Sequence, residues 1–396
     1  MTSANMTVYA TLGPVARGAG ISEIEVGLIF ATSGLLFSLT SSAWGRAADR
    51  HGGQLVIFIG LLGTALSSLI FAGLFDSWRD VIGAVNLFAA FLLARILYGL
   101  LAGGVQPAAT AWVVQTASDP NRATGAARVG AVVGLGSVIG PALAASSVDA
   151  AIWLPLMITG LLSGLAAIVI LLAAAAPAVT PKPAHREKEL TSPDMLRVYI
   201  VAFLFYFGLA ALQPTIAFFV QDRFHVETAL AIHRGGLVSA TFAGCALFVQ
   251  AFWIRRLPLS ARCLLSTGIA VSMLGFASGL LVTDIRWLLA AFALAGIGYG
   301  LAQPGLMIWA LLGAARHGQA EAAGRIQAAA SAAWVVGPFA GTAVYAIDFR
   351  GALAVAVTTM ALALAVTIAC RSQATPPPVP SVPPGRSPSW CRRSGR

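Results

Sequence analysis

The sequence predicts an all-α membrane protein of twelve transmembrane helices in two six-helix repeats. The chain is 58% hydrophobic and only 10% charged, whereas a soluble domain averages about 25% charged residues. It also repeats itself, because adding 197 to a first-half position returns the same residue at eight pairs of mostly Gly, Pro, Trp and Arg. The pairs are Gly99/Gly296, Gly103/Gly300, Gln106/Gln303, Pro107/Pro304, Trp112/Trp309, Arg128/Arg325, Gly140/Gly337 and Pro141/Pro338. Parallel repeats of this kind are typical of transporters whose substrate site lies between the halves.

A second offset, 209, extends the repeat toward the start of each half. The pairs are Gly27/Gly236, Leu28/Leu237, Ala31/Ala240, Thr32/Thr241, Trp44/Trp253 and Arg46/Arg255. A bilayer-spanning helix needs about 20 apolar residues, and this criterion places the twelve spans. Their approximate cores are 1–16, 24–46, 54–75, 84–115, 123–147, 150–175, 195–221, 234–256, 263–283, 286–312, 322–346 and 351–370.

Composition divides the chain into four parts. Six-helix bundles over 1–176 and 195–372 flank a polar, proline-containing segment, 177–194, which reads as a cytoplasmic linker. The tail 373–396 is rich in Pro, Ser and Arg and is expected to be disordered. Thirteen residues precede Pro14 in the first span, against about nineteen from Met195 to the equivalent Pro214. We therefore expect the first helix to be truncated.

The basic residues predict the orientation. With both termini in the cytoplasm, 18 Lys and Arg residues fall inside and 6 outside, which follows the positive-inside rule. This distribution explains the net charge of +10 without a nucleic-acid partner. Arg outnumbers Lys 23 to 2, a bias typical of a GC-rich bacterial genome. The expected location is therefore a bacterial cytoplasmic (inner) membrane, with lipid as the surrounding partner.

The turn between the second and third spans reads GRAADRHGG, from Gly45 to Gly53. Gly45 permits close helix contact, Asp49 can face a helix N-terminus or an arginine across the half interface, and Gly52 allows a tight reversal. This turn resembles the signature loop of the major facilitator superfamily, G-x-x-x-D-R-x-G, although the two basic residues expected next are replaced. The resemblance implies a cytoplasmic gate that latches in the outward-facing state, made by Gly45, Asp49, Arg50 and Gly52.

Arg95 is the one ionisable residue that we place deep within a span. Such a charge costs about 2.5–3.5 kcal/mol on insertion scales, so Arg95 should face a cavity or a carboxylate. The run from Arg95 to Gly99 resembles the fourth-helix motif of proton-linked superfamily members, which implies a role in proton coupling. The equivalent second-half residue is Phe292, so the repeat is broken at this position.

The fifth span contains Gly136, Gly140 and Pro141 and resembles the antiporter motif of the same superfamily, with alanines replacing its last two glycines. The eleventh span mirrors it with Gly337 and Pro338. Small residues let helices approach closely, and proline bends a helix. The resemblance implies an exporter, similar to the bacterial drug and siderophore exporters.

In this family helices 1, 4, 7 and 10 line the cavity, which implies a set of polar and aromatic substrate contacts. They are Tyr9, Gln106, Trp112, Tyr206, Gln213, Tyr299, Gln303 and Trp309. Gln106 and Gln303 either flank the pseudo-twofold axis or bond backbone groups freed by the prolines that follow them. The spans hold no deep carboxylate, and the acidic residues nearest to a proton path are Glu23, Glu25 and Asp222 at their outer ends.

The sequence thus predicts a secondary transporter that exports a small organic molecule in exchange for protons and acts as a monomer. No ATP-binding loop, catalytic constellation or metal-ligand spacing occurs, so we expect no enzyme, cofactor or metal site. Two alternatives stay open at this point. One is an importer of a small metabolite with the same fold, and the other is a non-transporting sensor or an inactive paralogue.

Overall fold

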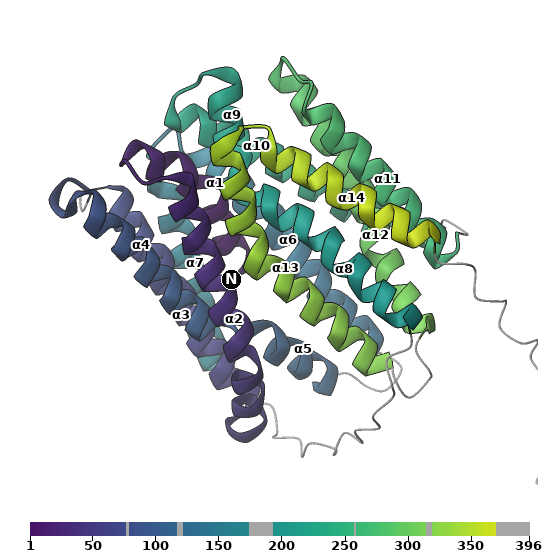
Figure 1. Cartoon of the computed structure of the whole chain (residues 1–396). Coiled ribbons are helices and arrows are strands. Elements are labelled where there is room, and N and C mark those ends of the chain that lie inside the picture. Colours follow the sequence, from purple (N-terminus) through teal and green to yellow (C-terminus); the bar gives the residue numbers. More distant parts are fainter. Residues whose placement is uncertain (77–78, 117–121, 174–192, 257–258, 314–318, 370–396) are drawn as a thin grey trace, which may run out of the picture.

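In the computed structural model every secondary-structure element of the described residues is helical, which confirms the predicted all-α fold (Figure 1). The structure describes residues 1–76, 79–116, 122–173, 193–256, 259–313 and 319–369. The predicted linker up to residue 192 and the predicted tail lie outside these residues. The division of the chain into domains stays a prediction.

Each predicted span has a helical counterpart. The first half contains α1 (Thr2–Gly18), α2 (Glu23–His51), α3 (Gly53–Phe75), α4 (Arg79–Ala102), α5 (Val105–Thr116), α6 (Arg122–Ser147) and α7 (Leu154–Leu172). The second half contains α8 (Pro193–Leu212), η2 (Gln213–Thr215), α9 (Ile216–Phe224), α10 (Thr228–Phe248), η3 (Val249–Trp253), η4 (Ile254–Arg256), α11 (Ala261–Gly279), α12 (Ile285–Gly313), α13 (Gln319–Ile347) and α14 (Gly351–Ala369).

Eleven helical segments of the described chain are long and apolar enough to cross a bilayer, so this is a multi-pass membrane protein. The first helix, α1, has 17 residues and is shorter than these segments. Its second-half equivalent runs through α8, η2 and α9, from Pro193 to Phe224.

The predicted fourth span, 84–115, is not one continuous helix. It breaks into α4 and α5 at Gly103 and Gly104, where α2 comes very close. A Cβ on Gly103 would lie 2.9 Å from the carbonyl oxygen of Phe37, and one on Gly104 would lie 2.6 Å from Cβ of Trp44. The equivalent α12 keeps only the first glycine, Gly300, and continues unbroken.

Two groups of helices pack side by side. In the first half, α3 packs against α7 and α4, and α2 packs against α4. In the second half, α11 packs against α12 and α14, and α8 packs against α13 and α14. Figure 1 shows α3, α4 and α7 on one flank and α11, α12 and α14 on the other, with α1, α2, α8 and α13 between them.

The halves meet through two equivalent glycine contacts. A Cβ on Gly27 of α2 would lie 3.0 Å from the carbonyl oxygen of Pro338 in α13, and a Cβ on Gly236 of α10 would lie 2.7 Å from that of Pro141 in α6. Gly27 and Gly236 are a repeat pair, and so are Pro141 and Pro338. The duplicated small residues therefore build the duplicated contacts between α2 and α13 and between α10 and α6.

Candidate functional site

A cavity lies between the two halves. One hollow, of about 300 Å³, is lined from the first half by residues that include Asn5, Tyr9 and Arg95, and from the second half by residues that include Gln327 and Trp334. A second hollow, of about 180 Å³, shares Met6, Val133, Ser137, Gln303 and Trp334 with it. Because they share these walls, the two hollows adjoin, and together they are called the central cavity below. Its position between the repeats is where transporters of this architecture bind substrate.

Arg95 lines this cavity and is almost completely buried, with 2% of its surface exposed. Its Nη2 donates a hydrogen bond to Oδ1 of Asn5 at 2.9 Å, and its buried Nε has no hydrogen-bond partner. The guanidinium carbon lies 4.7 Å from the ring centroid of Tyr98 and 5.1 Å from that of Phe30. As predicted, the charge faces the cavity rather than lipid, and aromatic faces stabilise it.

The second-half wall is polar and aromatic. Oε1 of Gln303 accepts a hydrogen bond from Nε2 of Gln250 at 2.8 Å. Gln250 belongs to η3, a π-helical turn, and such turns are frequent at functional sites. The Tyr299 ring stacks on Phe205 with centroids 5.3 Å apart. At the position equivalent to Arg95, Phe292 lines the second hollow and is buried.

Six of the eight predicted substrate contacts line the cavity. They are Tyr9, Gln106, Tyr206, Gln213, Tyr299 and Gln303. The exposed Gln106 and the hydrogen-bonded Gln303 line the same hollow.

For the other two residues, Trp112 and Trp309, contact with a substrate stays a prediction. Trp112, in α5 beyond the break at Gly104, packs beside buried residues of α3. Trp309 packs into the main apolar core, five residues beyond Pro304 in α12. Neither residue lines the two hollows.

The sequence reasoning missed the contribution of α13, because it took cavity residues from helices 1, 4, 7 and 10 alone. Gln327, Ser331 and Trp334 of α13 all line the first hollow. The Trp334 ring lies 6.1 Å from that of Tyr9, across the half interface. The sequence did contain a signal for Trp334. This residue lies four positions before Pro338 and therefore on the same face of α13, which is the face that packs on α2.

One end of the bundle, which we call the Arg17 end, is closed by a charged cluster. Arg17 of α1 contacts Asp222 of α9 with both Nη atoms, at 2.6 and 3.1 Å, and Glu23 of α2 at 2.6 Å. Its guanidinium also lies 4.5 Å from the ring of Phe218. The Tyr345 hydroxyl donates a hydrogen bond to the same carboxylate of Asp222. The two halves are thus joined by a bidentate, charge-assisted contact.

A second ion pair joins the halves at this end. Nδ1 of His233, in the first turns of α10, lies 3.1 Å from Oδ2 of Asp149, between α6 and α7. The pair is more exposed than the Arg17 cluster. The closure at the Arg17 end therefore has a half-buried part and an exposed part.

The opposite end, which we call the Asp49 end, carries the predicted signature loop. Gly52 adopts a φ of 92°, which confirms the tight reversal predicted there. Asp49 and Arg50 are exposed and form no hydrogen bond or ion pair with another described residue. The close helix contact expected at Gly45 is absent in this conformation, since a Cβ there would meet no described atom within 4 Å. The cavity opens toward this end, where Gln106 and Gln327 are exposed.

The predicted antiporter motif lies at a helix crossing. A Cβ on Gly136 of α6 would lie 2.9 Å from Cβ of Thr2 in α1, and one on Gly140 would overlap the carbonyl oxygen of Ser3. The Thr7 hydroxyl donates to the carbonyl oxygen of Gly140 at 3.1 Å. In the second half, Gly337 of α13 approaches Ala210 of α8 in the same way. Each motif therefore packs against the first helix of its own half, which is α1 for α6 and α8 for α13.

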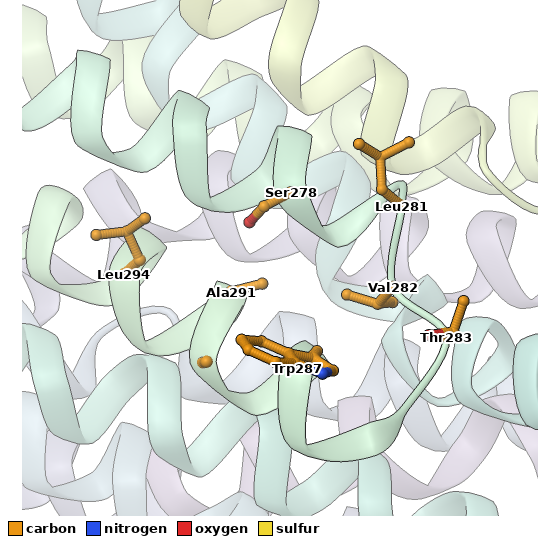
Figure 2. A pocket seen from close by; sticks show the side chains of 8 residues that line it. Ser278, Leu281, Val282, Thr283, Trp287, Ala291 and Leu294 are labelled. Atoms are coloured by element: carbon orange, nitrogen blue, oxygen red, sulfur yellow. The ribbon is translucent and has the colours of Figure 1, made fainter.

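A larger hollow, of about 470 Å³, lies elsewhere (Figure 2). It sits between α11 and α12 at the Arg17 end, and its lining is apolar apart from Ser278 and Thr283. Leu281 and Trp287 on its rim are 81% and 69% exposed, so it faces the outside of the bundle. An exposed tryptophan at a helix end is typical of the membrane interface. Its chemistry therefore suits lipid contact, and the cavity between the halves remains the candidate site.

Comparison with known proteins assigns the architecture. The family model described as Major Facilitator Superfamily matches residues 1–320. The quinolone resistance protein NorA of Staphylococcus aureus is 24% identical over 274 residues, covering 66% of this chain and 67% of that protein. Multidrug resistance protein 1 of Bacillus subtilis is 24% identical over 367 residues, covering 89% of each.

Solved structures share the fold. A bacterial homologue of the human lysosomal transporter Spinster, in an inward-facing and occupied conformation, superposes with a TM-score of 0.71 at 14% identity, covering 93% of both chains. The nucleoside transporter NupG gives a TM-score of 0.73 at 12% identity, covering 93% of this chain and 96% of NupG. At these identities the likeness concerns the fold alone.

Proposed function

The chain belongs to the Major Facilitator Superfamily, and from that premise we propose that it exports a small organic molecule, a drug-like compound or a siderophore, by proton antiport. Its relatives in Staphylococcus aureus and Bacillus subtilis are named for quinolone and multidrug resistance, which supports the drug-like class. The family and fold are those of transporters rather than enzymes. The proposed exporter acts as a monomer in a bacterial inner membrane.

The observation that carries this proposal is the asymmetry of the central cavity. It is closed at the Arg17 end by contacts between the halves and open at the Asp49 end. The count of 18 against 6 basic residues favours a cytoplasmic Asp49 end, so the proposed state is inward-facing. Rocking of 1–176 against 195–372 around the cavity would expose the same site to the other side.

In the outward-facing state the Asp49 end closes. We propose that Gly45, Asp49, Arg50 and Gly52 then form the cytoplasmic gate, with the Asp49 carboxylate facing a helix N-terminus or an arginine of the second half. The exposure of Asp49 and Arg50 here suits an unlatched gate. Gly136, Gly140 and Pro141, with Gly337 and Pro338, hold α1 and α8 against α6 and α13 while the halves move.

Proton coupling in this proposal is divided between two places. The guanidinium of Arg95 stays protonated in proteins, so it acts through its charge rather than by releasing a proton. Glu23 and Asp222 can accept a proton, and both contact Arg17 in the cluster that closes the outer end. Protonation of either carboxylate weakens that cluster and so favours opening of the outer end.

Everted membrane vesicles that contain the protein would test the function. With an acid-inside pH gradient, norfloxacin and a bacterial metabolite extract are supplied outside, and accumulated compounds are identified by mass spectrometry. The proposal predicts accumulation that stops when nigericin collapses the gradient. Accumulation that ignores the gradient would reject proton coupling, accumulation only in right-side-out vesicles would favour an importer, and no accumulation in either would favour the non-transporting alternative.

A further inference from the structure

The central cavity carries an unbalanced charge. Arg95 lines it, and none of the described residues that line its two hollows is an aspartate or a glutamate. The remaining polar groups of the lining are amides and hydroxyls, such as those of Asn5, Ser331 and Gln303. The chemistry of the lining is therefore that of a cationic pocket with neutral hydrogen-bonding walls.

Arg95 is held in place but not neutralised. Asn5 accepts one hydrogen bond from Nη2, and the buried Nε has no partner. The rings of Phe30 and Tyr98 give electrostatic support from their faces, but a ring carries no net charge. A buried charge without a counter-ion is costly, and a guanidinium is suited to bidentate contact with a carboxylate or a phosphate-like group. The site therefore lacks a negative charge opposite Arg95, and an anionic ligand can supply it.

An aromatic surface lies directly beside this charge. The ring centroid of Tyr9 is 5.9 Å from the guanidinium carbon of Arg95, and the ring of Trp334 lies 6.1 Å beyond Tyr9, edge to face. Tyr9 belongs to the first half and Trp334 to the second. A ligand that contacts Arg95 and both rings would therefore touch both halves, as a transported substrate must.

We propose that this cavity selects organic anions, with the anionic group on Arg95 and an aromatic or apolar body against Tyr9 and Trp334. The inference rests on the proposed transport function and adds the charge class of its substrate. It distinguishes this chain from a binder of cationic drugs, because an organic cation would meet a like charge and no carboxylate in the cavity.

Three probes with one ring system and different charge test the proposal. They are 2-naphthoate, 2-naphthylmethanol and 2-naphthylmethylammonium, bound to the full-length protein in nanodiscs and measured by equilibrium dialysis. The naphthoate should bind at least tenfold more tightly than the alcohol, and the ammonium most weakly. Equal affinities, preference for the ammonium, or no binding of the naphthoate would overturn the proposal.

Variants assign the selectivity to Arg95. Arg95→Gln should remove the preference for naphthoate over the alcohol, whereas Arg95→Lys should keep the preference with weaker binding. The alcohol serves as the fold control, because its binding should survive in both variants. Arg286→Gln, the same change at an exposed arginine outside the cavity, should alter nothing. Naphthoate affinity unchanged in Arg95→Gln would overturn the proposal.

A second variant keeps the test decisive should Arg95→Gln fail to fold. Gln327→Glu adds a carboxylate to the exposed rim of the same hollow at nearly constant size. It should weaken naphthoate at least threefold and strengthen the ammonium, and no change in either would count against the proposal. Because these measurements need no pH gradient, a failure here leaves the vesicle experiment to decide the transport function separately.

Discussion

The two ends of the bundle differ in how the halves meet. At the Arg17 end, Arg17 of the first half binds the Asp222 carboxylate of the second, and helix backbones are in contact at Gly27 and Gly236. At the Asp49 end, the charges of Asp49 and Arg50 extend into open space, and Gly45 faces no neighbour. Similar residue types thus make a seal at one end and an unused surface at the other.

The comparison shows that the contacts of a glycine or a charged residue in this fold depend on which end of the bundle is closed. A substitution that weakens the closed end should favour the alternative state, in which the Asp49 end closes, whereas the same substitution at the open end should have little effect on the present state. Distances between the halves at each end would report the shift.

The largest expected effect comes from the paired glycine contacts. In Gly27→Ala/Gly236→Ala, each new methyl group overlaps the opposing helix, at Thr342 and at the carbonyl oxygen of Pro141. Overpacking costs about 1–3 kcal/mol at each site, and distant sites add. The population should therefore move strongly toward the state that is open at the Arg17 end.

Spin-label distances would measure this shift in a chain whose four cysteines are replaced by serine. One pair, at the exposed Ile24 and Leu281, reports the Arg17 end, and another, at the exposed Leu55 and Leu312, reports the Asp49 end. The first distance should lengthen and the second shorten. Gly45→Ala is the matched control, and a shift as large as that of the double variant would contradict the comparison.

The Arg17 cluster should have the next largest effect. Arg17→Gln removes the bidentate contact and leaves Glu23 and Asp222 as neighbouring like charges. Hydrogen bonds to charged groups are worth about 1.5–3 kcal/mol, reduced here because the groups are only half-buried. The Ile24–Leu281 distance should shift toward longer values by less than in the double glycine variant.

A companion variant separates charge from packing. Asp222→Asn keeps the shape of the side chain while it imitates protonation, so it should open the Arg17 end in the same direction as Arg17→Gln. An Asp222→Asn variant with unchanged distances would show that this carboxylate does not couple proton binding to opening.

The two-repeat helical architecture could be predicted from the sequence because duplication leaves a pattern that needs no structure. Gly27 and Gly236 recur at one offset and Pro141 and Pro338 at another, and the structure places each glycine against the proline of the other half. The break of the fourth span could not be predicted. Gly103 and Gly104 permit a break, but small residues are needed there in any case because Phe37 and Trp44 of α2 come so close. The two glycines therefore do not by themselves indicate that the helix ends.

The cavity could be predicted only in part. Arg95 was found because a charge in an apolar run needs a polar destination, and the structure gives it one in the cavity. Trp334 was missed because cavity residues were sought on helices 1, 4, 7 and 10 alone, and because a tryptophan in an apolar helix fits core, lipid and cavity equally well. Trp112 lies outside the two hollows. The carboxylate partners of Arg17 lie in other helices, six and 205 residues away, so only the folded chain brings them together.

The smallest effect is expected at the exposed ion pair of the Arg17 end. The side chains of His233 and Asp149 are 32% and 64% exposed, and exposed pairs contribute about 0–1 kcal/mol. His233→Gln should therefore shift the Ile24–Leu281 distance less than Arg17→Gln does. A His233→Gln shift equal to that of Arg17→Gln would show that the seal depends on the packing of α10 rather than on charge.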